Sequence, residues 1–350
     1  MGDWKDLCPS LISSHSNTNS NPAEVNKTTA LLGLVEVLTE YSPDDIQDNL
    51  GSIGGLLVTC LNNQPAKVEV ACAKATCACV AVMRDDASRN NFKSAIASIL
   101  RICSDSLNRG DEVDTTLIIE YLVEVAAIQP LFFKTSLEEI VGAMLVIANS
   151  EPLDFATRSI ALEFLCSMCE SAPVLCRRCT QLTNGIVPCL FSIIFEQSAE
   201  VEESDWVQGS YCDDASADAP EESDTSDAIA EEAVERVSSS LGGKVMGASL
   251  MAAVTQLQTS PDPIHRRAAM VVLVRFAEGC ATLLIKTNQV SGMFAVLGKG
   301  IADTNPRVQY QACQGIGRFA ILFPDQIHDL LAMFLPPLVS LLSDPAASGA

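Results

Sequence analysis

The stretch DTNPRVQYQACQGIGRFA, residues 303–320, decides the fold of this chain. It opens with Asn305-Pro306, and a stripe of small and apolar residues follows at helical spacing: Val308, Ala312, Gly315, Ile316 and Phe319. Proline is tolerated in the first helical turn because the N–H group that it lacks would have no partner there. The pattern therefore predicts a helix with one apolar stripe. The stretch SPDPIHRRAAMVVLVRFAEGC, residues 260–280, follows the same plan.

Helix starts of this kind recur along the chain at nearly regular intervals. Five X-Pro steps each precede an apolar stripe: Asn21-Pro22, Gln64-Pro65, Glu151-Pro152, Ser260-Pro261 and Asn305-Pro306. Their prolines are separated by 43, 87, 109 and 45 residues. The second interval holds two units, and the third holds two units and an insertion. A repeat of about 40–47 residues made of two helices is typical of HEAT and armadillo units.

These intervals predict an all-α fold, a HEAT-repeat (armadillo-like) α-α superhelical solenoid. One solenoid is expected over residues 1–350, with about seven helix pairs. Neighbouring pairs stack because one helix cannot bury its stripe alone, and the expected product is a curved rod with a convex and a concave face. The predicted pairs are 23–40 with 43–62, 66–84 with 89–107, 112–128 with 134–149, 153–171 with 174–196, 227–241 with 243–258, 262–279 with 282–300, and 305–322 with 325–343.

Both ends of the chain are atypical for such a rod. Residues 4–14 have the pattern of a second helix whose first helix is missing, and the last eight residues read SDPAASGA. A terminal repeat normally carries a polar outer face, and neither end has one. We therefore expect the chain to be the middle of a longer solenoid, truncated at both ends.

Acidity is concentrated in one insertion. Between Glu196 and Glu235 there are 15 Asp or Glu residues and no Lys or Arg, whereas the whole chain has a formal net charge of -22. A run this acidic cannot form a core, so we expect an acidic disordered loop over residues 197–226 that presents charge to a basic partner. A solubilising insertion without a partner is the alternative. Trp206 favours a loop that docks, because a large apolar ring is unusual among solvated carboxylates.

The composition limits which partners the chain is expected to bind and in which compartment it is expected to act. A pI near 4.4 disfavours direct nucleic-acid binding, which needs Lys and Arg, and it favours basic partners. The N-terminus, MGDWKDLCPS, has no secretory pattern, and no apolar run was expected to approach the ~18–20 residues of a spanning helix. We therefore read the 14 cysteines as reduced thiols of a cytoplasmic or nuclear protein and expect no membrane insertion.

Four stretches carry a family resemblance. They are VEESDW at 201–206, AVERVSSSLGGKV at 233–245, and the two stretches at 260–280 and 303–320 quoted above. Their order and spacing resemble the importin-β (karyopherin-β) family, and within it the importin-5 (karyopherin β3) type. The resemblance is strongest over about 150–345 and is weaker but collinear from Trp4 to 150.

The resemblance implies a nuclear transport receptor that moves between cytoplasm and nucleus through the nuclear pore. Such receptors bind the basic, Lys/Arg-rich import signals of cargo proteins on the concave face and contact Phe-Gly nucleoporins on the convex face. RanGTP binding then releases the cargo. In the family the acidic loop contacts the Ran GTPase or basic cargo, and the resemblance assigns that contact to Glu202, Glu203, Asp205, Trp206, Asp213, Asp214, Glu221, Glu222 and Asp224.

The same resemblance limits how much of the transport cycle is expected of this chain. It provides no counterpart here for the family's N-terminal repeats, which hold the main Ran-binding surface, or for the C-terminal half of the arch. Complete Ran-driven release is therefore expected to need more than this chain. Further carboxylates on predicted second helices are candidates for cargo contact: Asp44, Asp45, Asp48, Glu138 and Glu139.

Two other functional classes are alternatives to a transport receptor. Four thiolates in the pairs Cys166-x-x-Cys169 and Cys176-x-x-Cys179 could hold zinc, but the six intervening residues are fewer than zinc ribbons use. Small apolar cysteines also fill helix seams, so no metal is expected. The three histidines are far apart and no catalytic motif occurs, which predicts neither an enzyme nor a cofactor. A HEAT scaffold such as a phosphatase regulatory subunit is the alternative to transport.

Overall fold

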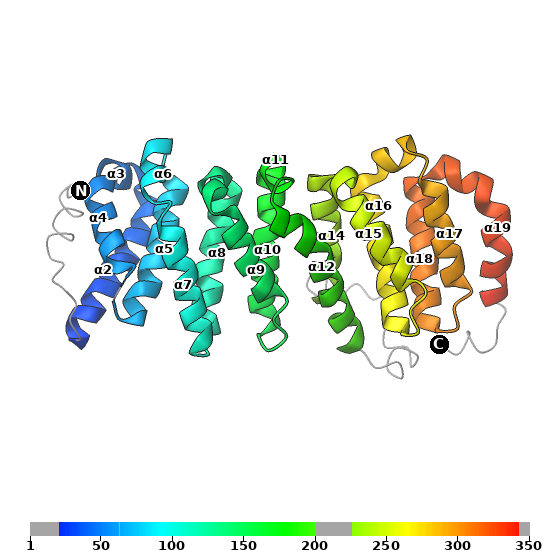
Figure 1. The fold of residues 1–350 in the computed structure, drawn as a ribbon, viewed down its shortest axis with the longest axis horizontal. Helices are drawn as coiled ribbons and strands as arrows, with labels where there is room; N and C mark the ends of the chain where they lie inside the picture. The colour runs from blue at the N-terminus through cyan, green and yellow to red at the C-terminus, as the bar shows by residue number, and fades with distance from the viewer. Residues whose placement is uncertain (1–20, 63, 201–225, 343–350) are drawn as a thin grey trace. The chain divides into compact units, whose positions relative to one another are not determined.

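The computed structural model describes residues 21–62, 64–200 and 226–342, and within those ranges every regular element is helical. The chain divides into two compact units, residues 1–175 and 176–350. Each unit is built from helix pairs of the HEAT type, as the periodicity predicts (Figure 1).

The N-terminal unit stacks its first helices in one row. The helix α2 packs against α5, α5 against α8, and α8 against α10, while α4, α7 and α9 form the second helices beside them (Figure 1). The elements of this unit are α2 (Pro22–Tyr41), α3 (Pro43–Asp48), α4 (Leu50–Cys60), α5 (Ala66–Val82), α6 (Asp86–Asn91), α7 (Ala95–Asn108), α8 (Glu112–Ile128), the 3-10 helix η2 (Pro130–Thr135), α9 (Leu137–Ala148) and α10 (Phe155–Ser171).

The C-terminal unit follows the same plan. The helix α16 packs against α14 on one side and α18 on the other, and α12, α15 and α17 also pack against it (Figure 1). After α11 (Pro173–Cys176), which ends at the boundary between the units, the elements are α12 (Thr180–Glu200), α14 (Ser226–Leu241), α15 (Gly243–Leu257), α16 (Pro263–Lys286), α17 (Val290–Ile301), α18 (Pro306–Leu322) and α19 (Pro324–Leu342).

Local capping explains where several first helices begin. The side chain of Asn21 accepts a hydrogen bond from the N–H of Ala23, that of Asp262 from Ile264, and that of Asn305 from Arg307 and Val308. In each case a proline follows the cap at the first helical position, so the lost N–H costs nothing. The X-Pro starts read at Asn21 and Asn305 are confirmed, and Asp262-Pro263 replaces Ser260-Pro261 as the start of α16.

The second helices depart from the prediction in several places. The segments predicted as one helix over 89–107 and over 174–196 each consist of a short and a long helix, α6 with α7 and α11 with α12. The segment predicted as one helix over 43–62 is two, α3 and α4, which meet at Asn49. The helix predicted over 282–300 is also wrong at its start. The helix α16 runs on to Lys286 through a kink at Cys280 (φ -128°), and α17 begins only at Val290. Asn288 makes this break with φ 55°, a left-handed conformation that asparagine tolerates better than most residues.

Polar side chains join one repeat to the next at the repeat spacing. Four such pairs are separated in sequence by 40 to 44 residues: Asn26 with Lys67, Thr116 with Thr157, Glu231 with Arg275, and Glu278 with Arg318. Hydrogen bonds at one recurring separation are expected only where successive repeats lie side by side. They support the repeat length read from the prolines.

Judged by length and composition alone, the helix α16 could cross a membrane. Its most apolar 18-residue window has a mean hydropathy of 1.9, and 61% of that window is buried inside the protein. The expectation that no segment reaches this length is therefore wrong. Burial against α14 and α18, and the ion pairs that Arg275 and Glu278 make, identify α16 as the central core helix of its unit.

Candidate functional site

The nine acidic-loop residues assigned by the resemblance lie outside the described residues. They are Glu202, Glu203, Asp205, Trp206, Asp213, Asp214, Glu221, Glu222 and Asp224. The structure describes α12 up to Glu200 and α14 from Ser226, so the stretch joins two helices of the C-terminal unit. Its role in binding stays a prediction.

Three of the candidate cargo-binding carboxylates lie on α3. This short helix is fixed by Ile46, which is fully buried, and it presents Asp44 and Asp48 to solvent while Asp45 is half-buried. Asp44 forms an ion pair with Arg84, forty residues later in the chain, and both side chains are largely exposed. An exposed pair of this kind contributes little to stability, about 0–1 kcal/mol, so Asp44 can exchange its partner readily.

The other two carboxylates lie in the first turn of α9. Leu137 and Ile140 are buried and anchor the helix, which leaves Glu138 and Glu139 exposed. Acidic residues in a first turn are stabilised by the helix dipole. The two carboxylates are therefore part of a well-formed helix start and are accessible to a partner.

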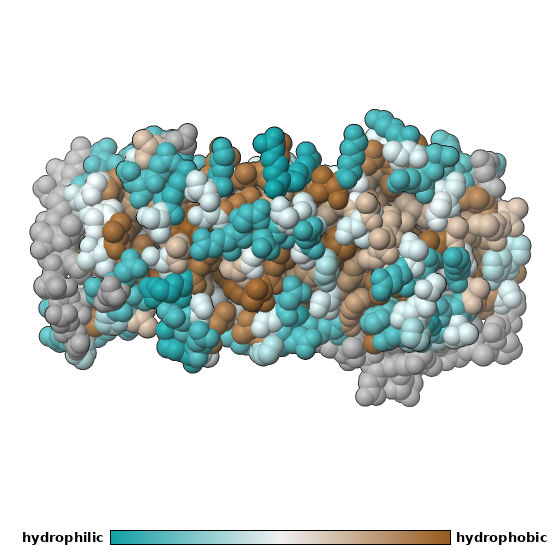
Figure 2. Space-filling model, viewed as in Figure 1, coloured by the Kyte–Doolittle hydropathy of each residue, from teal (hydrophilic) through white to brown (hydrophobic). Residues whose placement is uncertain are grey.

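The structure does not bring these five carboxylates into one site. The group on α3 belongs to the first repeat and the group on α9 to the third, with α6 and α7 of the second repeat between them in the chain. That intervening repeat carries cations as well as acids: Arg84, Arg89, Lys93, Arg101 and Arg109. Figure 2 shows mainly hydrophilic residues over the lower end of α7. A basic segment would meet two separate acidic groups on this unit.

A cluster on the first helices was missed by the sequence analysis. The hydroxyl of Tyr121 on α8 donates to Glu36 on α2, and Lys74 on α5 lies 3.7 Å from Glu36 and 6.0 Å from the centre of the Tyr121 ring. Burial, reinforced by Glu36, raises the pKa of Tyr121 well above its usual range.

This cluster spans three consecutive first helices because α5 is built from small residues. Ala71 and Ala78 lie about one turn before and after Lys74 on the same helix face, which leaves room for Tyr121 to reach α2 over α5. The two partners are 85 residues apart in sequence. Local periodicity cannot predict a contact between residues so far apart in the sequence. The run of Ala and Cys in α5 indicates only that neighbouring helices can pack closely against it.

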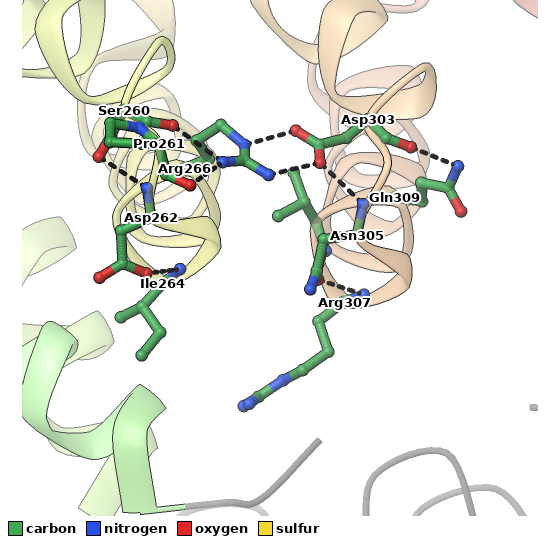
Figure 3. A network of polar contacts seen from close by, with 10 residues as sticks. Ser260, Pro261, Asp262, Ile264, Arg266, Asp303, Asn305, Arg307 and Gln309 are labelled. Atoms are coloured by element: carbon green, nitrogen blue, oxygen red, sulfur yellow. Dashed lines mark hydrogen bonds and ion pairs between the residues drawn. The ribbon is translucent and has the colours of Figure 1, made fainter. Parts of the chain in front are cut away.

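Arg266 is the centre of the polar network drawn in Figure 3. Its Nε and Nη2 donate to the two carboxylate oxygens of Asp303 at 2.7 and 2.8 Å, and its Nη1 donates to the carbonyls of Ser260 and Pro261 at 2.8 and 3.0 Å. Asp303 also accepts the N–H of Asn305 at 2.9 Å. Arg266 at the start of α16 therefore contacts the loop before α18, which belongs to the next repeat.

The pKa of Asp303 reflects two opposing effects. Burial alone would raise the pKa of this carboxyl, but the hydrogen bonds from Arg266 and from the backbone outweigh it, so the pKa is lowered. The hydrogen bond to Asp303 raises the pKa of Arg266. The pair is therefore ionised and holds the loop before α18 against the start of α16. The side chain of Arg307 points away from Asp303 in Figure 3.

A polar residue four positions after the N-cap ties several first helices to the preceding loop. Arg158 donates to the carbonyl of Ala148 at 3.1 Å, Arg266 to that of Ser260 at 2.8 Å, and Gln309 to that of Asp303 at 2.7 Å. Each bond covers a carbonyl near the end of the preceding repeat. These residues therefore serve the architecture of the repeat, and we assign them no binding role.

His265 is half-buried at the start of α16. Its Nδ1 lies 3.1 Å from the hydroxyl of Ser260, and its ring lies 4.4 Å, centre to centre, from Phe195 of α12. Both contacts fix the ring between α12 and α16. The contacts give His265 a packing role.

The cysteines proposed as a remote zinc site are buried on both sides of the unit boundary. Cys166 and Cys169 belong to α10 of the N-terminal unit, and Cys176 and Cys179 belong to the C-terminal unit. In the part of the chain that the structure describes, no group of three or more His, Cys, Asp or Glu residues is placed to hold a metal ion. All four cysteine side chains are buried, as small residues of a protein core are.

Two second helices of the C-terminal unit, α15 and α17, differ in charge from α3 and α9. The helices α15 and α17 contain no acidic residue, and each carries one lysine, Lys244 and Lys299. Figure 2 shows apolar and neutral residues over α15. The helices α15 and α17 therefore offer no carboxylate to a basic segment, unlike α3 and α9, while α19 carries one exposed acid, Asp325, in its first turn.

Comparison with known proteins agrees with this architecture. A family model described as importin repeat matches residues 150–248, and one described as IPO5-like, TPR repeats, matches residues 2–143. Importin subunit beta-3 of Saccharomyces cerevisiae is 29% identical over 258 residues, 72% of this chain and 23% of that protein. The crystal structures of Kap121p alone and bound to Nup53p each give a TM-score of 0.81 at 24% identity, covering 98% of this chain and 32% of theirs.

The helix pairs, the polar bridges at repeat spacing and the structural matches define an all-α HEAT-repeat protein. The two family matches, over residues 2–143 and 150–248, and the yeast relative narrow that class and support membership of the importin-β family over this part of the chain. It spans 23% of the curated relative and 32% of the structural relatives.

Proposed function

We propose that this chain is part of a nuclear transport receptor that binds the basic import signals of cargo proteins. The observation that carries the proposal is the pair of importin matches, over residues 2–143 and 150–248, in a chain whose residues 196–235 hold 15 carboxylates and no cation. Carboxylate-rich segments attract Lys/Arg-rich segments, raise the rate of encounter and lose affinity as salt rises.

The proposal gives the acidic residues between Glu202 and Asp224 the first contact with basic cargo or with Ran. The carboxylates on α3 and α9 provide two further anchoring points, because they are exposed and held on well-packed helices. RanGTP then weakens cargo binding, and Phe-Gly nucleoporins contact the opposite face. The protein acts in the cytoplasm, in the nucleus and at the pore, and its role includes no catalytic step.

The complexes formed by a structural relative fit this proposal. Kap121p has been crystallised bound to Nup53p, to Pho4p and to Ste12p. On the basis of the shared fold and of the carboxylates described above, we propose that the present chain also binds partner proteins of this kind.

The proposal is tested by fluorescence anisotropy of a labelled Lys-rich import-signal peptide, titrated with this chain with and without RanGTP at two salt concentrations. We expect salt-sensitive binding that RanGTP weakens. Binding that ignores RanGTP would remove the Ran-controlled part of the proposal. Absence of binding under all conditions would favour a HEAT scaffold outside transport, such as a phosphatase regulatory subunit.

A further inference from the structure

A cavity of about 540 Å³ lies in the C-terminal unit where α14 turns into α15. Its wall is mostly apolar and includes Leu241, Val245 and Leu283, with the thiol of Cys280 among them. Arg177 and Lys244 are the charged residues of the lining, and no acidic side chain is among the described residues that form it. The volume is within the range of ligand pockets, about 300–1,000 Å³.

The cavity follows from how this repeat makes its turn. Three repeats insert a short helix between their first and second long helices, namely α3, α6 and α11, whereas the turns from α16 to α17 and from α18 to α19 have none. Here the chain passes from α14 to α15 through Gly242 alone, whose φ of 81° is a left-handed conformation that favours glycine. No short helix then covers the neighbouring part of α16, which kinks at Cys280.

The walls of the cavity are held rigidly. Arg177 donates from Nε to the carbonyl of Leu241 at 2.8 Å and from Nη2 to that of Ser240 at 2.7 Å, which fixes its guanidinium at the end of α14. The thiol of Cys280 donates to the carbonyl of Ser238 at 3.3 Å. A β-carbon on Gly243 would lie 2.6 Å from Cδ2 of Leu283, so the glycine leaves room for the Leu283 side chain beside the cavity.

The charge of the cavity lining, which comes from Arg177 and Lys244, is opposite to that of the chain as a whole. Residues 236–322 contain nine Lys or Arg and only three Asp or Glu, in a chain of net charge -22. All three acids have internal partners: Asp262 caps α16, Asp303 binds Arg266, and Glu278 binds Arg275 and Arg318. Lys244 is exposed at the rim, and the described residues include no ion-pair partner for it.

We propose that this cavity binds an acidic peptide segment in which a large apolar side chain lies beside carboxylates. The apolar side chain packs against Leu241, Val245 and Leu283, and the carboxylates lie at Lys244 and Arg177. An acidic segment is favoured because the rim is cationic and an acid-free wall gives a carboxylate no repulsive neighbour. The site takes the opposite charge from the basic signals proposed above, so it is independent of that function.

The test uses a fluorescein-labelled peptide, Glu-Asp-Phe-Leu-Glu-Asp, titrated with the whole chain by fluorescence anisotropy. Two control peptides replace Phe-Leu by Ser-Ser or the four acids by Lys. Lys244→Glu reverses the charge at the rim, and Thr282→Trp fills the cavity from an exposed lining position. Lys299→Glu is the matched control, because it makes the same charge change on α17 outside the lining.

We expect Lys244→Glu and Thr282→Trp each to weaken binding about tenfold or more, and Lys299→Glu to weaken it less than about twofold. Circular dichroism confirms that each variant keeps its helices. Equal losses for Lys244→Glu and Lys299→Glu would mean diffuse attraction and overturn the site, as would unchanged binding in Thr282→Trp. Failure to bind the acidic peptide also overturns it, whereas failure of the proposed transport role appears separately as no binding of the basic import-signal peptide.

Discussion

Replacing Asp303 by alanine tests whether polar bridges between repeats stabilise the fold. The change removes the carboxylate that binds Arg266 in two hydrogen bonds, and the two side chains are only 15% and 12% exposed. Removing one partner of a buried pair costs about 3–5 kcal/mol because the other charge is left uncompensated. Since this pair keeps some contact with water, we expect a loss of about 2–3 kcal/mol.

Hydrogen–deuterium exchange followed by mass spectrometry is the suitable assay, because repeat proteins open locally and a single unfolding midpoint can hide the effect. A loss of about 2–3 kcal/mol corresponds to roughly 30- to 150-fold less protection in peptides from the start of α16 and of α18. The double change Arg266→Met with Asp303→Ala should recover part of that protection, because no buried charge is then left alone.

The effect should also depend on pH. The folded-state pKa of Asp303 is lowered, so its contribution is present above the unfolded pKa of about 3.9 and is lost as pH falls through the folded value. Asp44→Ala is the control, because its pair with Arg84 has the same chemistry but is exposed. The reasoning is refuted if Asp303→Ala destabilises its surroundings no more than Asp44→Ala does.

Two further predictions concern helix packing and ionisation. Gly279→Ala should destabilise the C-terminal unit by about 1–3 kcal/mol in urea denaturation, because a β-carbon there would lie 2.7 Å from the carbonyl oxygen of Glu235. Gly292→Ala should instead stabilise α17 by about 0.5–1 kcal/mol, because a β-carbon there would have nothing within 4 Å. Equal effects of the two changes would contradict the close approach of α14 and α16. Tyr121→Phe should remove one phenol that ionises well above pH 10 in an absorbance titration at about 295 nm, since burial and Glu36 raise its pKa. Wild-type stability should fall as pH rises above about 10, where only the unfolded phenol ionises, and a titration unchanged by the substitution would contradict the cluster.

The helix starts could be predicted because their causes are local. Asn21-Pro22 and Asn305-Pro306 hold both the capping side chain and the proline within two residues, so the sequence alone placed α2 and α18. The break between α16 and α17 was misplaced between residues 279 and 282, where Gly279 and Thr282 are residue types common at helix ends, whereas the helix runs on to Lys286. The chain ends that helix with a left-handed asparagine, Asn288, which no periodic pattern marks.

The candidate sites were less predictable than the fold. Asp44 and Glu138 were recognised as surface acids because they flank buried apolar residues in helices of clear period. Their separation by a repeat with mixed charges depends on the stacking of whole repeats. The same is true of Tyr121 and Glu36, which meet only because α5 is narrow. Contacts of this kind are set by tertiary packing, which the sequence of either partner does not contain.

The distribution of charge has a consequence for cargo binding. In the N-terminal unit, the exposed carboxylates of α3 and α9 are available to a basic segment, whereas α15 and α17 of the C-terminal unit offer only lysines. If the acidic stretch makes the first contact, the segment it captures should be anchored away from α15 and α17. Asp44→Lys and Glu138→Lys should therefore weaken binding more than Lys299→Glu changes it.

The central claim is that the carboxylates between Glu202 and Asp224 attract basic import signals. The most direct test compares the wild-type chain with a variant in which the eight acidic residues assigned to this contact are changed to Asn or Gln, using anisotropy of a Lys-rich peptide at low and high salt. The account predicts that the variant binds at least about tenfold more weakly at low salt and has a much smaller salt dependence. Equal affinity and equal salt dependence for the two proteins would contradict it.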